Sequence, residues 1–313
     1  MIALNLYFKL YAHNVPVNGG DRSAIYNLHA GTVVMISRVQ YDVLKDTPHH
    51  TIEQLGLRYA PAQPELVYNY MQTLVSNDLG FLTKEPQRFP DVPVQWHLPA
   101  HLHIAVLDVN KKYYALQPVL RQLDQLLCKH LELRMHLDQF TQRQITGLLD
   151  YLNTAVFRSV SWITEYAPWI SMEKMEEYHK NYGKLEHLLV YNAPEIPEKP
   201  SSSGIGWTSG GIDEWNDGPS SYKDKHVINM HYFMEAQQHN PYFNRRVYID
   251  KWGNIRNSQS DGKVFGNVND HVLSTVIRSS EFREKWLISP DKVPRAQRDP
   301  LRYAKVDDGQ EQD

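Results

Sequence analysis

The sequence predicts an α/β protein made of an N-terminal winged helix-turn-helix, a partial (β/α) barrel and a C-terminal hairpin-and-helix region. Three patterns predict this class. Residues 1–85 place three alternating apolar–polar runs before three helical runs and a short strand. Residues 101–235 alternate between strand and helix patterns, which is typical of βαβ units and a parallel sheet. Residues 246–256 read as two short strands around Lys251-Trp252-Gly253, a hairpin signal.

The first domain, residues 1–85, is assigned from periodicity and helix-start signals. Its predicted strands are residues 4–12, 24–28 and 32–36, with a wing strand at 81–83. Its predicted helices are residues 38–44, 51–59 and 64–77. Thr51, three residues before Gln54, starts a capping box, and Pro64 with Glu65 marks the start of the last helix. This order of elements describes a winged helix-turn-helix.

The middle of the chain begins with a linker. Four prolines from Pro86 to Pro99 predict an extended stretch over residues 86–100. The strands predicted after it are residues 101–109, 130–135, 159–165, 185–191 and 226–233. The helices predicted between them are residues 116–127, 142–153 and 171–181. We therefore expect a partial barrel over residues 101–235 and a separate C-terminal region over residues 236–313.

Composition excludes several classes of protein. The 313 residues, 42% of them apolar, suffice for roughly two domains. A formal net charge of −3 gives no general attraction to nucleic acid or to an anionic membrane. No apolar run approaches the roughly 18–20 residues that span a bilayer, and the first residues lack the basic leader of a secretory signal. We expect a cytoplasmic protein without nucleic-acid or membrane partners.

A single cysteine, Cys128, limits the chemistry of sulfur ligands. One thiol excludes an intrachain disulfide and a zinc site built from paired thiolates. A four-iron cluster takes four thiolates, or three with substrate at the open iron, so this chain lacks the ligands for one. Because Cys128 follows Leu126 and Leu127 in a helical pattern, we expect it to be a buried apolar side chain.

The hairpin region carries the most specific pattern. Residues 242–267 read YFNRR, an apolar residue and YID, then G-x-I-x-N and FGN. This pattern resembles the peptide maturases of grasp-with-spasm systems, which carry an iron–sulfur SPASM region after a radical-SAM-like core. In that family a cysteine stands where this chain has Asp261, and a later cysteine-rich segment corresponds to residues 299–305. The loop at residues 108–114 also lacks the CxxxCxxC motif. The resemblance implies a degenerate radical-SAM/SPASM protein without catalytic residues, metal or cofactor.

The first domain is similar to the PqqD-like recognition domains of ribosomal-peptide maturation, in LYFKLYAHNVPV, in its glycine-bearing turns and in its DLGFLT ending. Those domains bind the leader of a precursor peptide as an added strand, through backbone hydrogen bonds and alternate side-chain pockets. By position, the resemblance implies an edge formed by Thr32, Val33, Val34, Met35 and Ile36. It implies a groove floor formed by Val67, Tyr70, Met71 and Leu74. A charge at Val34 or Met71 is then expected to abolish peptide binding and leave the fold intact.

Other interpretations of the same domain stay open. A winged helix-turn-helix can bind DNA, but residues 61–79 contain no Lys or Arg, and DNA affinity depends on neutralising phosphates. The apolar residues of the predicted groove can also be ordinary core.

Two further patterns suggest sites elsewhere. His101 and His103 share one face of a strand and, with Asp108 or Glu132, are candidate ligands for zinc or iron. The Gly/Ser-rich stretch 201–218 lacks a phosphate-loop motif and predicts a flexible loop. Trp207 and Trp215 on this loop are predicted contacts for a partner protein.

The sequence favours a non-catalytic subunit that recognises a ribosomally made precursor peptide and delivers it to a modifying enzyme. The resemblance implies an ATP-grasp ligase as that enzyme. The alternative is an enzyme without a cluster that modifies the same peptide at a His/Asp/Glu metal site in the barrel.

Overall fold

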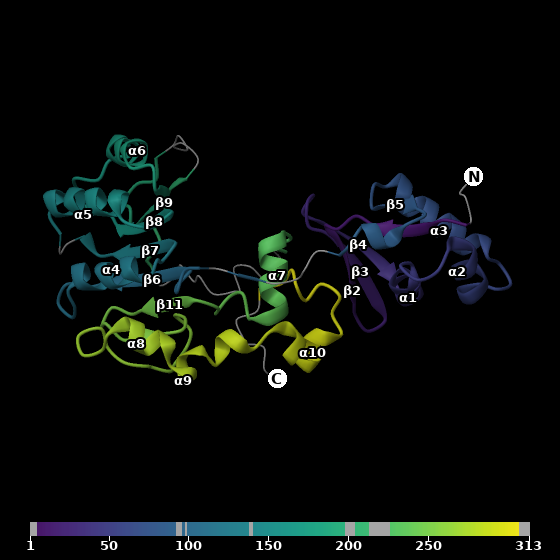
Figure 1. Ribbon diagram of the computed structural model, residues 1–313. Helices are drawn as coiled ribbons and strands as arrows, with labels where there is room; N and C mark the ends of the chain where they lie inside the picture. The colour runs from purple at the N-terminus through teal and green to yellow at the C-terminus, as the bar shows by residue number, and fades with distance from the viewer. Residues whose placement is uncertain are drawn as a thin grey trace. The chain divides into compact units, whose positions relative to one another are not determined.

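A computed structural model describes residues 5–91, 96–97, 99–137, 140–197, 204–212 and 226–306 (Figure 1). They group into two compact units. Unit 1 contains the described residues up to 97, together with 226–241 and 288–306. Unit 2 contains the described residues from 99 to 212 and residues 242–287. This division differs from the predicted boundaries at 85, 100 and 235, because two late segments belong with the N-terminal part.

Unit 1 contains two small antiparallel sheets. β1 (Tyr7–Leu10) pairs with β5 (Gly80–Thr83). β2 (Asn14–Asn18), β3 (Arg22–Asn27) and β4 (Thr32–Ser37) form the second sheet, with β3 in the middle. β2 was not predicted, because Pro16 and its two asparagines are poor strand formers.

Three helices follow these strands as predicted. They are α1 (Arg38–Asp46), α2 (Ile52–Tyr59) and α3 (Glu65–Ser76). Capping boxes at Ser37 and Thr51 start the first two, so the one predicted at Thr51 is confirmed. A short 3₁₀ turn, η1 (Pro86–Arg88), comes after β5. These elements match the predicted strands and helices, whereas their assembly as a winged helix-turn-helix stays a prediction.

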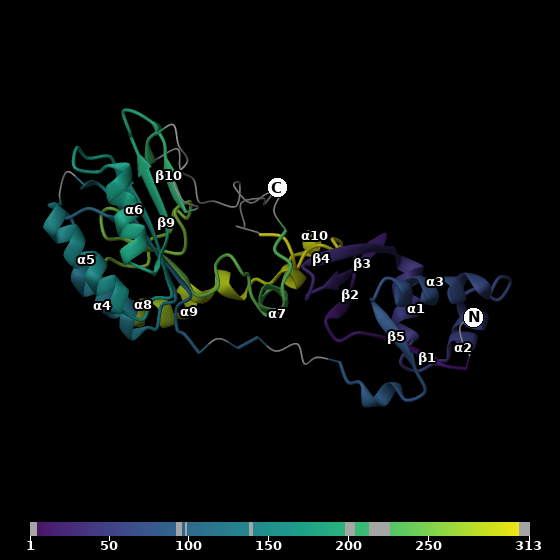
Figure 2. The ribbon, with the colours of Figure 1, turned by 90° about the horizontal axis from the view of Figure 1, so that it is seen from above.

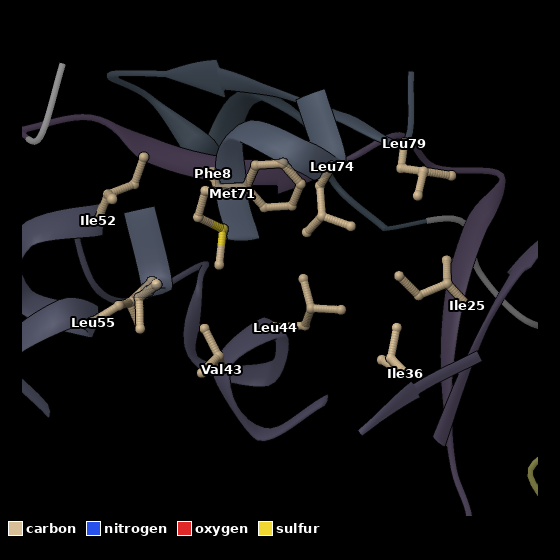
Figure 3. Close-up of a cluster of buried hydrophobic side chains, with 11 residues drawn as sticks. Phe8, Ile25, Ile36, Val43, Leu44, Ile52, Leu55, Met71, Leu74 and Leu79 are labelled. Atoms are coloured by element: carbon tan, nitrogen blue, oxygen red, sulfur yellow. The ribbon is translucent and has the colours of Figure 1, made fainter. Parts of the chain in front are cut away.

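The three helices and one face of the β2-β3-β4 sheet enclose a core (Figure 3). Ile25 and Ile36 come from the sheet, and Met71 and Leu74 from α3. The remaining buried members are Phe8, Val43, Leu44, Ile52, Leu55, Val67 and Leu79. Burial of such side chains stabilises a fold by roughly 1.5–3 kcal/mol each, so this cluster fixes how α3 lies against β4.

The opposite face of the same sheet is covered by segments from late in the chain. Val17, Ala24 and Tyr26 pack there against Phe233 of α7 (Met230–Gln238) and against Tyr303. The Tyr26 hydroxyl donates to the carbonyl of Pro300 (2.9 Å). The short 3₁₀ turn η6 (Pro290–Lys292) contacts α7 and the short helix α10 (Pro294–Gln297), and both elements belong to unit 1.

The predicted strand at residues 226–233 is therefore wrong over most of its length. The Asn229 side chain accepts from the N–H of Tyr232 (2.9 Å), which starts α7 as a helix. Phe233 and Ala236 then lie on its buried side, three residues apart as helical geometry requires.

Unit 2 is a mixed α/β unit built on a seven-stranded sheet of order β10-β9-β8-β7-β6-β11-β12. The four predicted strands are β6 (Ile104–Val109), β7 (His130–Met135), β8 (Ser159–Glu165) and β9 (Leu185–Tyr191), all parallel. Between them lie α4 (Leu116–Gln125), α5 (Gln142–Thr154) and α6 (Met172–Asn181). The strands follow one another in chain order, and right-handed crossovers then place all three helices on one face (Figure 2). Closure into a partial barrel stays a prediction.

The predicted hairpin forms one edge of this sheet. β11 (Arg246–Ile249) pairs in parallel with β6 and antiparallel with β12 (Ile255–Arg256). Gly253 takes the left-handed conformation in the turn, with φ of 84°, which explains a glycine at this position. Two short helices, α8 (Leu273–Arg278) and α9 (Ser280–Arg283), and the turn η5 (Lys285–Leu287) follow.

The other edge is β10 (Ile205–Trp207), which pairs in parallel with β9. This strand lies within the stretch predicted to be a flexible loop. Throughout the described residues, no helix combines the length and the apolar character needed to cross a membrane.

Candidate functional site

The two edges of the β2-β3-β4 sheet differ in how much of their backbone is already bonded. On β2, Pro16 has no N–H, the N–H of Asn14 donates to the Tyr11 carbonyl (2.8 Å), and the carbonyl of Asn18 accepts from Arg302 (2.5 Å). These features block the addition of another strand. In the part of the chain that the structure describes, β4 pairs only with β3.

The register shows which backbone groups β4 presents outward. The N–H of Leu28 donates to the carbonyl of His13 (2.9 Å), so alternate residues from Leu28 back along β3 bond toward β2. The intervening residues, Ile25 among them, bond toward β4. Ile25 lies opposite Val34, so Val34 bonds inward. The N–H and C=O groups of Val33 and Met35 therefore point away from the sheet.

A groove of about 610 Å³ lies between β4 and α3. Its apolar lining residues are Val34, Met35, Ile36, Leu66, Tyr70, Leu74 and Leu79. Its polar lining residues are Asn27, Thr32, Gln40, Asn69, Thr73 and Asn77. Val34 is 39% exposed and Leu66 57% exposed, so large apolar side chains meet solvent here. An edge strand above such a groove can take an extended peptide as a further strand.

Six of the nine residues predicted to hold a leader peptide line this groove. They are Thr32, Val34, Met35, Ile36, Tyr70 and Leu74. Val33 does not line the groove, because its side chain packs against the cluster around Tyr26 on the opposite face of the sheet.

Val67 and Met71 lie in the core rather than in the groove. Met71 is fully buried and Val67 is 6% exposed, both within the cluster that includes Phe8. A charge at Met71 would therefore act on folding rather than on peptide contact.

Sequence reasoning placed Tyr70 and Leu74 of α3 correctly but missed Leu66, Asn69 and Thr73, which also line the groove. The apolar stripe Val67-Met71-Leu74 faces the core, and the adjacent stripe Leu66-Asn69-Thr73 faces the groove. The signal that could have identified it is an apolar residue, Leu66, beside a run of neutral polar residues at spacing three and four.

Tyr70 lines the groove and carries a polar atom that is buried. Its hydroxyl is buried and makes no hydrogen bond within the described residues. Burial raises the pKa of this hydroxyl well above its ordinary value. A buried donor without an acceptor costs stability.

The histidines predicted as metal ligands are not gathered at one end of the large sheet. His103 precedes β6, where its ring lies 4.8 Å from that of His130. Asp108 lies five residues farther along the chain, about 16 Å away at roughly 3.3 Å per strand residue. His101 is exposed, and Glu132 pairs with Arg134 (2.6 Å). Among the residues that the structure describes, no three His, Cys, Asp or Glu side chains are arranged to hold a metal ion.

A different polar group lies at the carboxyl ends of the parallel strands. His136, after β7, has its Nδ1 3.1 Å from the Tyr191 hydroxyl and 3.5 Å from a carboxylate oxygen of Glu165. Burial raises the pKa of Asp108, and the nearby charges of His136 and Arg134 lower it by a smaller amount. His136 is thus in contact with Tyr191 and Glu165, whereas one carboxylate oxygen of Asp108 is buried without a hydrogen bond among the described residues.

The tryptophans predicted to contact a partner differ in what the structure describes. Trp207 lies in β10 at a sheet edge and is partly buried, with its ring N–H enclosed. Trp215 lies outside the described residues.

Cys128 is buried, as predicted, and burial raises the pKa of its thiol to about 12. Asp261, where the resembling family carries a cysteine, is an ion-pair partner of Lys285 (2.9 Å). Nearby, the ring of Phe282 packs edge-on against Phe265 and Trp286. Ion pairing and aromatic packing therefore hold the region that follows the hairpin.

Comparisons with known proteins give few matches. No protein-family model and no curated protein matches the chain. It is similar to SuiB of Streptococcus suis bound to S-adenosylmethionine, with 11% identity and a TM-score of 0.26 over 91% of this chain and 89% of that one. SuiB bound to the precursor peptide SuiA gives 10% identity and a TM-score of 0.25 over 91% and 89%. A further SuiB structure gives 11% identity and a TM-score of 0.23 over 90% of this chain and 89% of that one. TM-scores of this size do not establish a common fold.

Proposed function

We propose that the protein is a non-catalytic recognition subunit that binds an extended peptide along β4 and presents it to a modifying enzyme. The observation that carries this proposal is the outer edge of β4, to which no further strand of the described residues is paired, beside the groove lined by α3. The outward N–H and C=O groups of Val33 and Met35 are available to an added strand. The side chains of Val34 and Leu66 provide the apolar surface on which that strand would rest.

The size of the groove supports a peptide as ligand. A volume of about 610 Å³ accommodates several side chains rather than a whole folded partner. β4 is six residues long, and alternate residues of an added strand would point into the groove.

The class of peptide and the partner come from the sequence resemblance. It implies the leader of a ribosomally made precursor as the ligand and an ATP-grasp ligase as the modifying enzyme. The absence of catalysis rests on the single cysteine of the chain, which cannot supply the three or four thiolates of an iron–sulfur cluster.

The test uses a displayed library of random ten-residue peptides selected against the full-length protein. The best binder is then N-methylated at one backbone position at a time, and the affinity of each version is measured by fluorescence anisotropy. Strand addition predicts a period of two, because only alternate N–H groups of the peptide would bond to β4. We expect losses of at least tenfold at alternate positions and small changes between them.

A matched pair of protein variants checks the same contact from the other side. Met35→Pro removes an outward N–H, whereas Met35→Ala keeps it and removes the side chain. We expect the proline variant alone to lose binding by more than tenfold. An N-methylation profile without a period of two, or equal effects of the two variants, would refute strand addition. A change in peptide mass after incubation with this protein alone would refute the non-catalytic role.

A further inference from the structure

The lining of the groove is uncharged. None of the thirteen described residues that line it is Asp, Glu, Lys or Arg. Charged residues make up 22% of the chain, so about three would be expected in a set of this size. The charged residues next to it in sequence are Arg38, Glu65 and Asp78, and Arg38 is already paired with Asp42 (3.3 Å).

The polarity of the groove also changes in a regular way around α3. At about 100° per residue, Leu74 lies nearest the core, followed by Tyr70, then Leu66, then Thr73 and finally Asn69. The wall therefore passes from apolar next to the core to amide and hydroxyl at its outer margin.

The outer margin offers hydrogen bonds to a ligand. Within the described residues, the Thr73 hydroxyl donates to the carbonyl of Asn69 (2.9 Å) and the Asn77 amide donates to the carbonyl of Thr73 (2.7 Å). The side-chain amide of Asn69 is exposed and makes no bond to the described part of the protein. It can donate to and accept from a neutral polar side chain.

We infer that this groove selects an uncharged peptide strand, with apolar side chains over Leu66 and Tyr70 and an amide- or hydroxyl-bearing side chain at Asn69. An ionised side chain pointing into the groove would lose hydration without gaining a counter-ion, whichever its sign. Neutral polar side chains avoid that cost. This inference rests on the proposed function, since it describes the peptide that the same groove takes.

The experiment starts from the peptides selected from the random library. At each groove-facing position of the best binder, the residue is changed to Glu, Lys, Gln or Leu. Affinity is then measured in 50 mM and 500 mM NaCl. We expect Glu and Lys each to weaken binding at least tenfold, Gln or Leu to change it less than threefold, and salt to have less than a threefold effect.

Two protein variants control for the sign of the charge. With Asn69→Lys, a Glu at the peptide position that contacts residue 69 should no longer weaken binding. With Asn69→Asp, a Lys at that peptide position should no longer weaken binding. Because Asn69 is exposed, both variants should keep the wild-type circular dichroism spectrum and melting temperature.

The outcomes separate this inference from the function on which it rests. Binding with the two-residue N-methylation period, together with a preference for one sign of charge or a strong salt effect, would overturn the inference and leave strand addition standing. Recovery of no binder, or of binders indifferent to Met35→Pro, would overturn both.

Discussion

The distinction between the core face and the groove face of α3 gives the sharpest prediction of stability. Met71 is fully buried, whereas Leu66, on the adjacent stripe, is 57% exposed. Met71→Ala leaves a cavity in the cluster with Phe8 and Leu55, and such truncations cost about 2–5 kcal/mol. Leu66→Ala removes a side chain from solvent contact, where changes stay within about 0.5 kcal/mol.

A charge at the same two positions should separate folding from binding. Met71→Asp would bury a carboxylate without a partner, at a cost comparable with the roughly 5–15 kcal/mol that stabilises a whole domain. The backbone amides of unit 1 should then lose their protection against hydrogen exchange, because the unit unfolds. Leu66→Asp should keep that protection and weaken binding of the selected peptide at least tenfold, because the charge would lie in the groove.

Hydrogen exchange followed by mass spectrometry is the appropriate assay, because the chain has two units and need not unfold in one step. Peptides covering α2 and α3 report the opening free energy of unit 1, and peptides covering β7 serve as an internal reference in unit 2. A loss below about 1 kcal/mol for Met71→Ala, or equal losses for both alanine variants, would refute the assignment of the two faces.

Four variants or conditions test other parts of the structure. Tyr70→Phe should raise the stability of unit 1 by about 1 kcal/mol in urea titration, because it removes a buried hydroxyl without an acceptor; a loss of similar size would show that the hydroxyl is bonded. Cys128 should resist alkylation by iodoacetamide at pH 8 until urea unfolds the protein, since its thiol pKa is about 12 in the fold; rapid labelling of the native protein would contradict its burial. Glu132→Gln should cost unit 2 about 3–5 kcal/mol, because the buried Arg134 loses its carboxylate; a change below 1 kcal/mol would mean that its other contacts suffice. Burial lowers the pKa of His130, so the unfolded chain binds that proton more tightly and unit 2 should lose stability as pH falls below about 6.5; a His130→Gln variant with an unchanged pH dependence would assign the effect elsewhere.

Local patterns predicted the elements that carry the groove. The alternation over residues 32–36 predicts β4, and the helical stripe after Pro64 predicts α3, because both periodicities are intrinsic to the backbone. The capping box at Thr51 fixed the start of α2 to the residue. The apolar patterns of β7, β8 and β9 likewise predicted the first and last residue of each strand.

Features that depend on distant partners could not be predicted. A stripe of apolar residues identifies the buried face of a helix, but the groove lies on the margin of that face, where Leu66 and Asn69 are. Their exposure depends on how β4 packs relative to α3 in the folded protein. The periodicity of the sequence does not encode that arrangement. The helix at Phe233 was read as a strand because its aromatic, strand-favouring residues gain their helical context from packing on β3.

The cover of β3 by late segments sets the order in which this protein can be completed. Unit 1 needs α7 and residues around Tyr303 to shield Tyr26, and roughly 200 residues separate Leu28 from Asn229. At 5–20 residues per second, a ribosome takes about 10–40 s to supply that stretch. During this time an apolar sheet face stands uncovered on the nascent chain. Synthesis therefore leaves unit 1 unfinished until after the large sheet has emerged, and chains cut short before residue 288 should be the ones that chaperones retain.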